Sequence, residues 1–307
     1  MTLITARKKA YLLLISVAAI WGFSSPIIKY AFTDFPPIIF LTYRFFITSV
    51  VMIPFLLITQ PKTWHHLSNL DSKSWIFLVL TGFLGSTVHL GLLFWGLDLT
   101  TSLDASILSS TSPILVALAG HYFLKEKISR FEKIGMFIAF IGTIFMVSQP
   151  LFSGHKLLSG NVLGNSLVLL GTCSWVIYAI ITKNELKHKL SPLLLTTVMF
   201  FAGFISMTVI TIIKYSPFQV INFFYHSSLS GHLAVIFMAF AAGAFGFWAY
   251  QKAQKSIETS EANIFLYLSP LFTIPLSYFW LGEPITAGFI IGSVIIAAGV
   301  FISQLRR

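Results

Sequence analysis

The sequence predicts an all-α polytopic membrane protein with ten transmembrane helices, built as two inverted five-helix repeats. Three observations predict this fold class: a very apolar composition, ten apolar segments of membrane-spanning length, and an internal repeat with five spans in each half. Apolar residues make up 56% of the 307 residues and charged residues only 10%. So few charges cannot cover the surface of a soluble domain, and such an apolar chain is not intrinsically disordered.

Ten apolar segments are long enough to cross a hydrocarbon core of ~30 Å as helices. Lipid offers no hydrogen-bond partners, so each spanning segment must satisfy its own backbone, and none of them alternates in polarity as a barrel strand does. The first segment is too long for a signal peptide and is predicted to be retained. The spans are 10–31, 37–58, 75–97, 104–124, 131–149, 162–183, 193–214, 230–251, 260–281 and 286–305.

The basic residues predict the orientation of these spans, because cytoplasmic loops are enriched in Lys and Arg. With the N-terminus in the cytoplasm, 16 of the 20 Lys and Arg residues fall on the inner side. Only Lys29, Lys156 and Lys214 lie outside or near outer span ends, and Arg44 lies within a span. The sequence therefore predicts a multi-pass protein of a bacterial inner membrane with both termini in the cytoplasm. The net charge of +10 is then explained without a nucleic-acid partner.

An internal repeat divides the chain into a first half at 1–150 and a second half at 151–307. Residues 105–142 align with 262–299 at a constant offset, and 11 of the 38 positions are identical, including a Ser-Pro pair, a Glu and two Gly residues. Each half holds five spans. Because five is odd, the second half must enter the membrane from the opposite face. Inverted repeats of this kind are typical of secondary transporters, with the site near the midplane.

The motifs of both halves resemble those of the drug/metabolite transporter superfamily, EamA type. Trp21-Gly22 followed by Lys29 resembles the signature of the first span, and Tyr43-Arg44-Phe45 resembles that of the second. The matching blocks read SPILVALAGHYFLKEKISRFEKIG at 112–135 and SPLFTIPLSYFWLGEPITAGFIIG at 269–292. The resemblance covers roughly 10–305. It implies a ten-helix carrier of small organic metabolites with a central cavity, and many such proteins export amino acids or their derivatives.

We therefore expect a secondary transporter of small organic metabolites that exports amino acids or related compounds by alternating access. Three alternatives stay open: a metabolite uptake or exchange carrier, an intramembrane enzyme acting on lipid substrates, and a membrane scaffold. The chain has no Gly-Lys dipeptide, no His-Glu-x-x-His motif and no Gly-x-Ser-x-Gly motif. This excludes a P-loop pump and favours a protein that is not an enzyme. The expected partners are a small-molecule substrate and the lipid bilayer, with no cofactor and no metal site.

Arg44 is the permanent charge that lies clearly inside a predicted span, roughly 10 Å from its outer end. A cation at the bilayer centre costs at least ~2.5–3.5 kcal/mol unless it is paired or hydrated. Two interpretations stay open. Arg44 anchors a substrate carboxylate, or it is a structural residue that binds backbone carbonyls or extends to the interface. Lys29 lies nearer its span end and is expected at the interface.

Four aromatic residues lie well inside their spans, although Trp and Tyr usually gather at membrane interfaces. They are Trp21, Trp175, Tyr178 and Tyr267. Rings at this depth suit a cavity that encloses an organic substrate, and packing between helices is the alternative. We treat all four as candidate substrate-binding residues.

A polar stretch precedes Pro113 in the fourth span and includes Ser109 and Ser112. Because proline leaves the carbonyl four residues earlier unbonded, the stretch predicts a discontinuous helix that lines a cavity. Both serines are candidate substrate-binding residues. A Ser-Pro kink without a binding role is the alternative.

His89 is the best titratable candidate inside the spans, because all ten Asp and Glu residues lie at span ends or in loops. It is a candidate for substrate binding or proton coupling, and a hydrogen-bonded structural histidine is the alternative. Glu126 and Glu283 occupy equivalent repeat positions, and each is expected to shape the loop before the next helix. Ser129 with Glu132 forms a capping-box pattern, with Thr286 as the matching N-cap.

Small residues share one face in the fifth span and one face in the tenth, which allows helices to approach closely. They are Gly135, Ala139 and Gly142 in one span and Gly288, Gly292 and Gly299 in the other. Helix packing is the prediction, and the seam of a homodimer is the alternative.

Overall fold

The computed structural model describes residues 3–62, 72–100, 105, 108–147, 161–187, 190–281 and 287–305, and this part of the chain is helical with no strand. The described parts of all ten predicted spans are helical, apart from short turns at 110–111 and 304–305. Glu283 and Thr286 lie outside the described residues. The prediction of an all-helical polytopic membrane protein is confirmed.

The first half begins with α1 (Leu3–Ala31) and α2 (Pro37–Thr59). The third span consists of α4 (Ser72–Phe83), the π-helical η1 (Leu84–Val88) and α5 (His89–Leu99). The half ends with α7 (Ser112–Leu124) and α8 (Arg130–Val147). Proline occupies the first turn of α2 and of α7, where its missing N–H is not needed. Ser129 and Glu132 form the predicted capping box at the start of α8, with bonds of 2.8 and 3.1 Å.

The second half repeats this order with α9 (Val162–Lys187) and α10 (Pro192–Lys214). Its third span consists of α12 (Leu229–Phe237), the π-helical η3 (Met238–Phe245) and α13 (Gly246–Gln254). Its fourth consists of α14 (Thr259–Ile264), the 3₁₀ segment η4 (Phe265–Leu268) and α15 (Ser269–Leu281), and α16 (Ala287–Ser303) is the fifth. The third span of each half thus carries a π-helical segment, and the fourth span of each departs from α geometry before its Ser-Pro pair.

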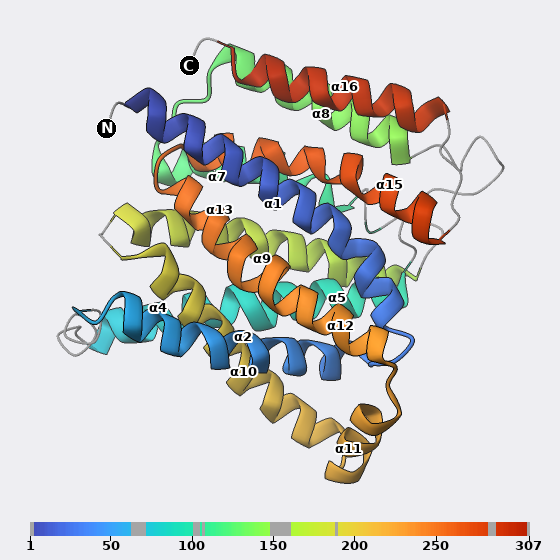
Figure 1. The fold of residues 1–307 in the computed structure, drawn as a ribbon. Coiled ribbons are helices and arrows are strands. Elements are labelled where there is room, and N and C mark those ends of the chain that lie inside the picture. Colours follow the sequence, from blue (N-terminus) through green and yellow to red (C-terminus); the bar gives the residue numbers. More distant parts are fainter. Residues whose placement is uncertain are drawn as a thin grey trace.

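The two halves run in opposite directions through the bundle. In Figure 1, α1 starts at the end where both termini lie, whereas α9 ends there. The neighbours are paired accordingly: α2 packs on α10, α8 packs on α16, and the contact of α5 with α9 is mirrored by that of α13 with α1. These pairings are those of a two-fold axis that relates inverted halves.

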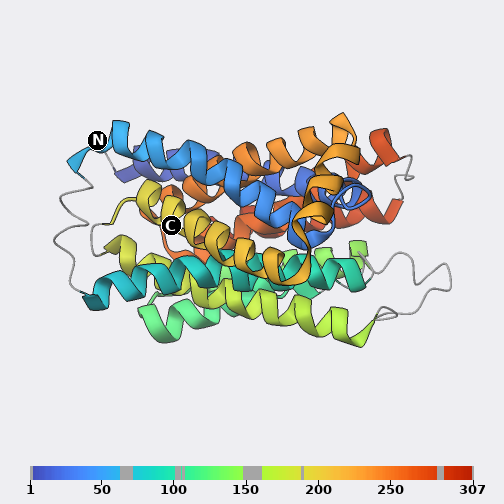
Figure 2. The same ribbon diagram turned by 90° about the horizontal axis from the view of Figure 1, so that it is seen from below.

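We call the end of the bundle that carries both termini, Arg7, Lys125 and Lys183 the basic end. Figure 2 shows the helices side by side along the length of the bundle. Among the described residues, six continuous helices are long and apolar enough to cross a membrane, and Ser112–Leu124 and Ile290–Ser303 are shorter apolar helices. Large apolar side chains such as Ile58, Phe123 and Phe301 face outward, as expected for a lipid-facing surface.

One helix was not predicted. The amphipathic α11 (Pro217–His226) follows α10 at the end opposite the termini (Figure 1). A capping box of Ser216 and Gln219 starts it, and none of its residues is buried. A search of the sequence for membrane spans does not find α11, because α11 is only 10 residues long.

The small residues of the fifth and tenth spans lie between α8 and α16 of the same chain. A Cβ added at Gly135 would lie 2.4 Å from the Gly299 carbonyl oxygen and 2.5 Å from the Ser303 backbone nitrogen. A Cβ at Gly299 would lie 2.5 Å from the Ala139 backbone nitrogen. The predicted helix packing is therefore present, and it joins the two halves of one chain.

Candidate substrate site at the centre of the bundle

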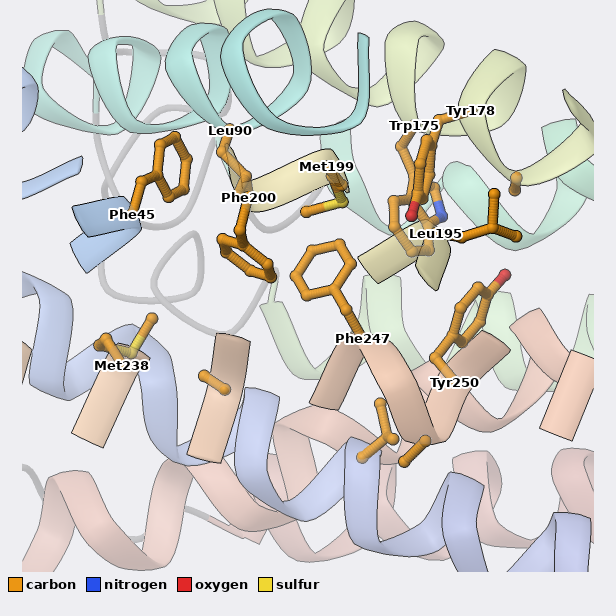
Figure 3. Close-up of a cluster of buried hydrophobic side chains, with 14 of the residues drawn as sticks. Phe45, Leu90, Trp175, Tyr178, Leu195, Met199, Phe200, Met238, Phe247 and Tyr250 are labelled. Carbon is orange, nitrogen blue, oxygen red and sulfur yellow. The ribbon is translucent and has the colours of Figure 1, made fainter. Parts of the chain in front are cut away.

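Five aromatic side chains from three helices meet at the centre of the bundle. The rings of Trp21 and Trp175 lie 5.7 Å apart, edge to face. Trp175 also lies 5.1 Å from Tyr250 and 5.7 Å from Tyr178, and Phe247 lies 5.2 Å from Trp21. We call these five residues the aromatic cluster, most of which is drawn in Figure 3. The structure thus brings together three of the four aromatic residues that the sequence singled out, and adds Phe247 and Tyr250.

The two π-helical segments make room for rings of this cluster. A Cβ at Gly85 in η1 would lie 2.4 Å from the Tyr178 ring, and one at Gly246, just after η3, would lie 2.6 Å from Trp21 Nε1. Trp21 Nε1 also donates to the Ala242 carbonyl of η3 at 3.0 Å. π-helical turns recur at functional sites. In this chain they let a ring from the first span of each half lie directly against the opposite half.

Two uncharged amide side chains, Asn263 and Gln251, bind the polar ends of the rings. Trp175 Nε1 donates to Asn263 Oδ1 at 3.1 Å, and Asn263 Nδ2 donates to the Tyr250 hydroxyl at 2.6 Å. Gln251 Nε2 donates to the Tyr178 hydroxyl at 2.6 Å, and Gln251 Oε1 accepts from the Thr196 hydroxyl at 3.2 Å. Sequence reasoning missed Gln251 and Asn263, although an amide side chain within an apolar span is the signal that identifies them.

Arg44 lies fully inside the bundle beside this cluster. Its side chain is 2% exposed, and its guanidinium lies 5.9 Å from the ring centres of both Phe94 and Phe200. Phe200 packs 5.5 Å from Phe247, which connects the arginine to the aromatic cluster. Within the described residues, Arg44 Nε has no hydrogen-bond partner. The two rings give Arg44 only a weak cation–π interaction. Its guanidinium can therefore still form hydrogen bonds and an ion pair with an anion.

His89 is also at the centre and is held in place. Its ring lies 5.2 Å from that of Trp175, and its Nδ1 lies 2.9 Å from the Gly171 carbonyl oxygen. Because a carbonyl only accepts, Nδ1 carries the proton, and a neutral ring leaves Nε2 as an acceptor. His89 therefore makes the hydrogen bond that the structural alternative expects, and its partner is the Gly171 carbonyl of α9.

The remaining predicted residues do not join the cluster. Tyr267 is buried in a second apolar core with Met136 and Ile296, so it lies between α8, α16 and its own helix. Ser109 and Ser112 lie around the break that precedes Pro113, and no hydrogen bond or ring contact found among the described residues links them to the aromatic cluster. The predicted break is present, because helix resumes at Ser112 after a turn.

The grooves that the structure shows lie away from this centre. One of about 400 Å³ lies between α2, α10 and α11, and one of about 340 Å³ lies between α7 and α9. None of the eight predicted site residues lines either groove. Arg44 is 2% exposed in this conformation, so a ligand reaches its side chain only after neighbouring groups move.

Both halves match a known family. The EamA-like transporter family matches residues 8–148 and 162–305. The uncharacterized transporter YyaM of Bacillus subtilis (strain 168) is 26% identical over 290 residues, which cover 94% of this chain and 92% of that protein. An uncharacterized transporter of Archaeoglobus fulgidus is 25% identical over 303 residues, 97% of this chain and all of that one (100%).

A solved crystal structure shares the fold at a TM-score of 0.78, with 15% sequence identity and 97% of each chain covered. The family match extends over nearly the whole chain, and both relatives are named uncharacterized transporters. The two matched ranges correspond to the two halves of the structure. The chain belongs to the EamA-like transporter family.

Proposed function

We propose that this membrane transporter is a secondary carrier that moves a small organic metabolite with a carboxylate group through the centre of the bundle by alternating access. Arg44 carries this proposal, because a buried guanidinium with an unpartnered Nε is the group that a carboxylate pairs with. The aromatic cluster then contacts the apolar part of the substrate. Amino acids and related compounds are the proposed substrate class, and export across a bacterial inner membrane is the proposed direction.

The uncharged surroundings of Arg44 support an anionic substrate. All ten carboxylates of the chain lie at span ends or in loops, and the polar groups beside the cluster are the amides of Gln251 and Asn263. A carboxylate that enters the centre therefore neutralises Arg44 without competition from Asp or Glu. The absence of a mid-span carboxylate also leaves His89 as the proposed group for proton coupling, if the flux is coupled.

A flux assay tests the proposed function directly. Purified protein in liposomes is expected to move some members of a panel of labelled amino acids and organic acids faster than protein-free liposomes do. Overproduction in cells is expected to raise the same compounds in the medium. A protein that moves no member of the panel, and that leaves the extracellular metabolites unchanged, contradicts the proposal.

The proposed orientation makes a separate prediction. We expect tags on either terminus to be accessible from the cytoplasm, because the basic end carries most Lys and Arg residues. A cysteine introduced into the loop 150–161 is expected to react with an impermeant thiol reagent from the outside. Protease protection in inverted and right-side-out vesicles measures this. A terminus that is accessible only from the outside contradicts the orientation.

A further inference from the structure

The beginning of the ninth span is capped by a residue from the other half of the chain. Glu126, in the connection between α7 and α8, accepts from the backbone nitrogens of Thr259 at 2.8 Å and Ser260 at 3.2 Å. The first N–H groups of a helix have no partner within it and carry partial positive charge. A buried carboxylate thus completes the first turn of α14. The Glu126 backbone also bonds to Gly120 and His121 in the loop that Glu126 was expected to shape.

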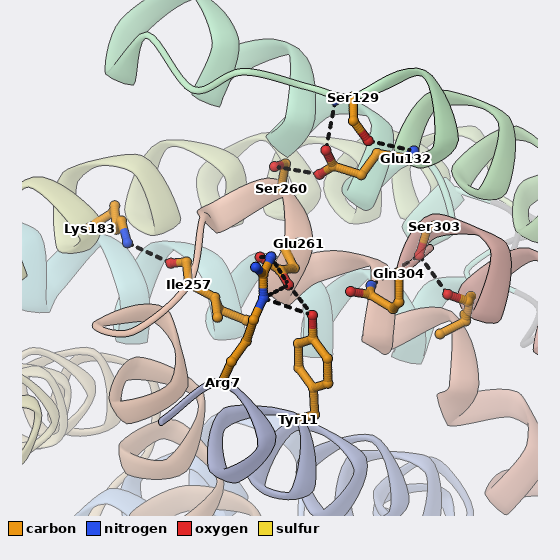
Figure 4. A network of polar contacts seen from close by, with 11 residues as sticks. Arg7, Tyr11, Ser129, Glu132, Lys183, Ile257, Ser260, Glu261, Ser303 and Gln304 are labelled. Carbon is orange, nitrogen blue, oxygen red and sulfur yellow. Dashed lines mark hydrogen bonds and ion pairs between the residues drawn. The ribbon is translucent and has the colours of Figure 1, made fainter. Parts of the chain in front are cut away.

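A second carboxylate joins the same turn of α14 to the first span. Glu261 is 1% exposed, and Arg7 Nη2 lies 2.8 and 2.9 Å from its two oxygens. Arg7 Nε donates to the same carboxylate at 3.0 Å, and the Tyr11 hydroxyl makes a short hydrogen bond to it. Figure 4 shows Arg7 and Tyr11 converging on Glu261 from α1. Bidentate Arg–carboxylate pairs of this kind are strong and directional.

Two further contacts hold the approach to α14. Ser260 Oγ donates to Glu132 of α8 at 3.3 Å. Lys183 of α9 donates to the carbonyls of Gln254 and Ile257 at 2.5 and 2.6 Å, so it fixes the turn between α13 and α14. Lys29, the repeat counterpart of Lys183, is exposed near the opposite end of the bundle. Lys183 is therefore buried and fixes the turn before α14, whereas its repeat counterpart Lys29 is exposed.

The same helix turn reaches the aromatic cluster. Asn263 follows Glu261 by two residues and binds both Trp175 and Tyr250, at 3.1 and 2.6 Å. Movement of α14 away from Glu126 and Arg7 would withdraw Asn263 from both rings. One short segment, α14, thus makes both the contacts with Glu126 and Arg7 at the basic end and the contacts with the Trp175 and Tyr250 rings.

We infer that residues 259–263 are the gate between the centre of the bundle and the basic end. Glu126, Glu261, Arg7 and Tyr11 hold the gate closed in the conformation described above. The charged and hydroxyl groups that contact Thr259, Ser260 and Glu261 come from α1, α8 and the connection between α7 and α8, all in the first half. Movement of the halves relative to each other therefore breaks these contacts and opens the gate. This inference rests on the proposed function, because a gate has a role only in a protein that moves a substrate through its centre.

Thiol labelling tests the gate without any substrate. Cys173 is the single cysteine of the chain, so Cys173→Ser leaves a background in which Ala262→Cys places one thiol inside α14. Ala262 is completely buried (0% exposed). We expect a membrane-impermeant maleimide to label this thiol slowly from either side. Combining Arg7→Gln with Glu126→Gln is expected to raise the labelling rate from the basic end at least about tenfold, because two charge-assisted contacts are lost.

Matched variants separate the gate from general damage. Lys8→Gln removes the same charge as Arg7→Gln from an exposed neighbour, and Asp34→Ala removes the acceptor of a hydrogen bond from Ser228 at the opposite end. Neither is expected to change labelling from the basic end. Tyr11→Phe, which removes one hydroxyl, is expected to give a smaller rise of about two- to fivefold.

Charge reversal gives a second, independent measurement. Arg7→Glu and Glu261→Arg are each expected to speed labelling, and the two together are expected to restore a slow rate. Unchanged labelling in the Arg7→Gln and Glu126→Gln double variant, or an equal rise from both sides of the membrane, overturns the gate. If labelling behaves as expected but the flux assay shows no transport, the proposed function fails while the opening of α14 stands.

Discussion

Replacing Arg44 by Met is expected to lower transport at subsaturating substrate roughly 10- to 100-fold while leaving the thermal stability of the protein unchanged or higher. The guanidinium is 2% exposed and its Nε has no partner among the described residues, so the closed protein bears the cost of a buried cation, about 2.5–3.5 kcal/mol at a span centre. Methionine fills a similar volume without that cost. The substrate, however, loses a charge-assisted contact of about 1.5–3 kcal/mol, which corresponds to roughly 10- to 100-fold in apparent affinity.

The two readouts of this variant distinguish a binding role from a structural one. Flux in liposomes measures the first, and the apparent unfolding midpoint in detergent measures the second. Arg44→Lys keeps the charge but replaces a planar fork by a point charge, so a partial loss of flux is expected. Lys214→Met is the matched control, because Lys214 lies against the rings of Trp95 and Tyr215 at a span end. Normal flux in Arg44→Met, or a clear fall in its unfolding midpoint, would assign Arg44 to packing.

Adding one methyl group at Gly135 is expected to destabilise the protein strongly. The new Cβ would lie 2.4–2.7 Å from three backbone atoms of α16. Because backbone atoms cannot rotate away as a side chain does, α8 and α16 must separate, and overpacking of this kind costs about 1–3 kcal/mol. Gly135→Ala is therefore expected to lower the unfolding midpoint in detergent micelles, and Gly135→Leu to prevent accumulation of folded protein.

Gly91→Ala is the matched control for this prediction. A Cβ at Gly91 would meet only the terminal methyl of Met207, at 2.9 Å, which is the flexible end of a side chain. Alanine also favours helix by about 1 kcal/mol over glycine, so this variant is expected to be neutral or stabilising. An equal fall in both variants would mean that the close approach of α8 and α16 is not what Gly135 provides.

The sequence by itself determined where the apolar helices lie and that the second half is inverted relative to the first. These follow from local physics, because each segment must satisfy its own backbone hydrogen bonds in lipid and because the odd repeat forces inversion. It also determined features that lie within one helix turn, such as the capping box of Ser129 and Glu132 and the break before Pro113. Each of these depends on residues no more than four positions apart.

Only the tertiary structure decided which of the singled-out residues meet. The packing of the inverted halves brings the rings of Trp21 and Trp175 into contact at the centre of the bundle. Tyr267, in contrast, lies in a separate apolar core against α8 and α16. The same inversion places Glu126 on the first turn of α14, a bond between residues 133 positions apart. A sequence pattern relates residues that are neighbours along one helix. The contacts named here join different helices and therefore depend on how the whole bundle packs. Each contact forms only because the close packing of the other side chains holds the helices in place.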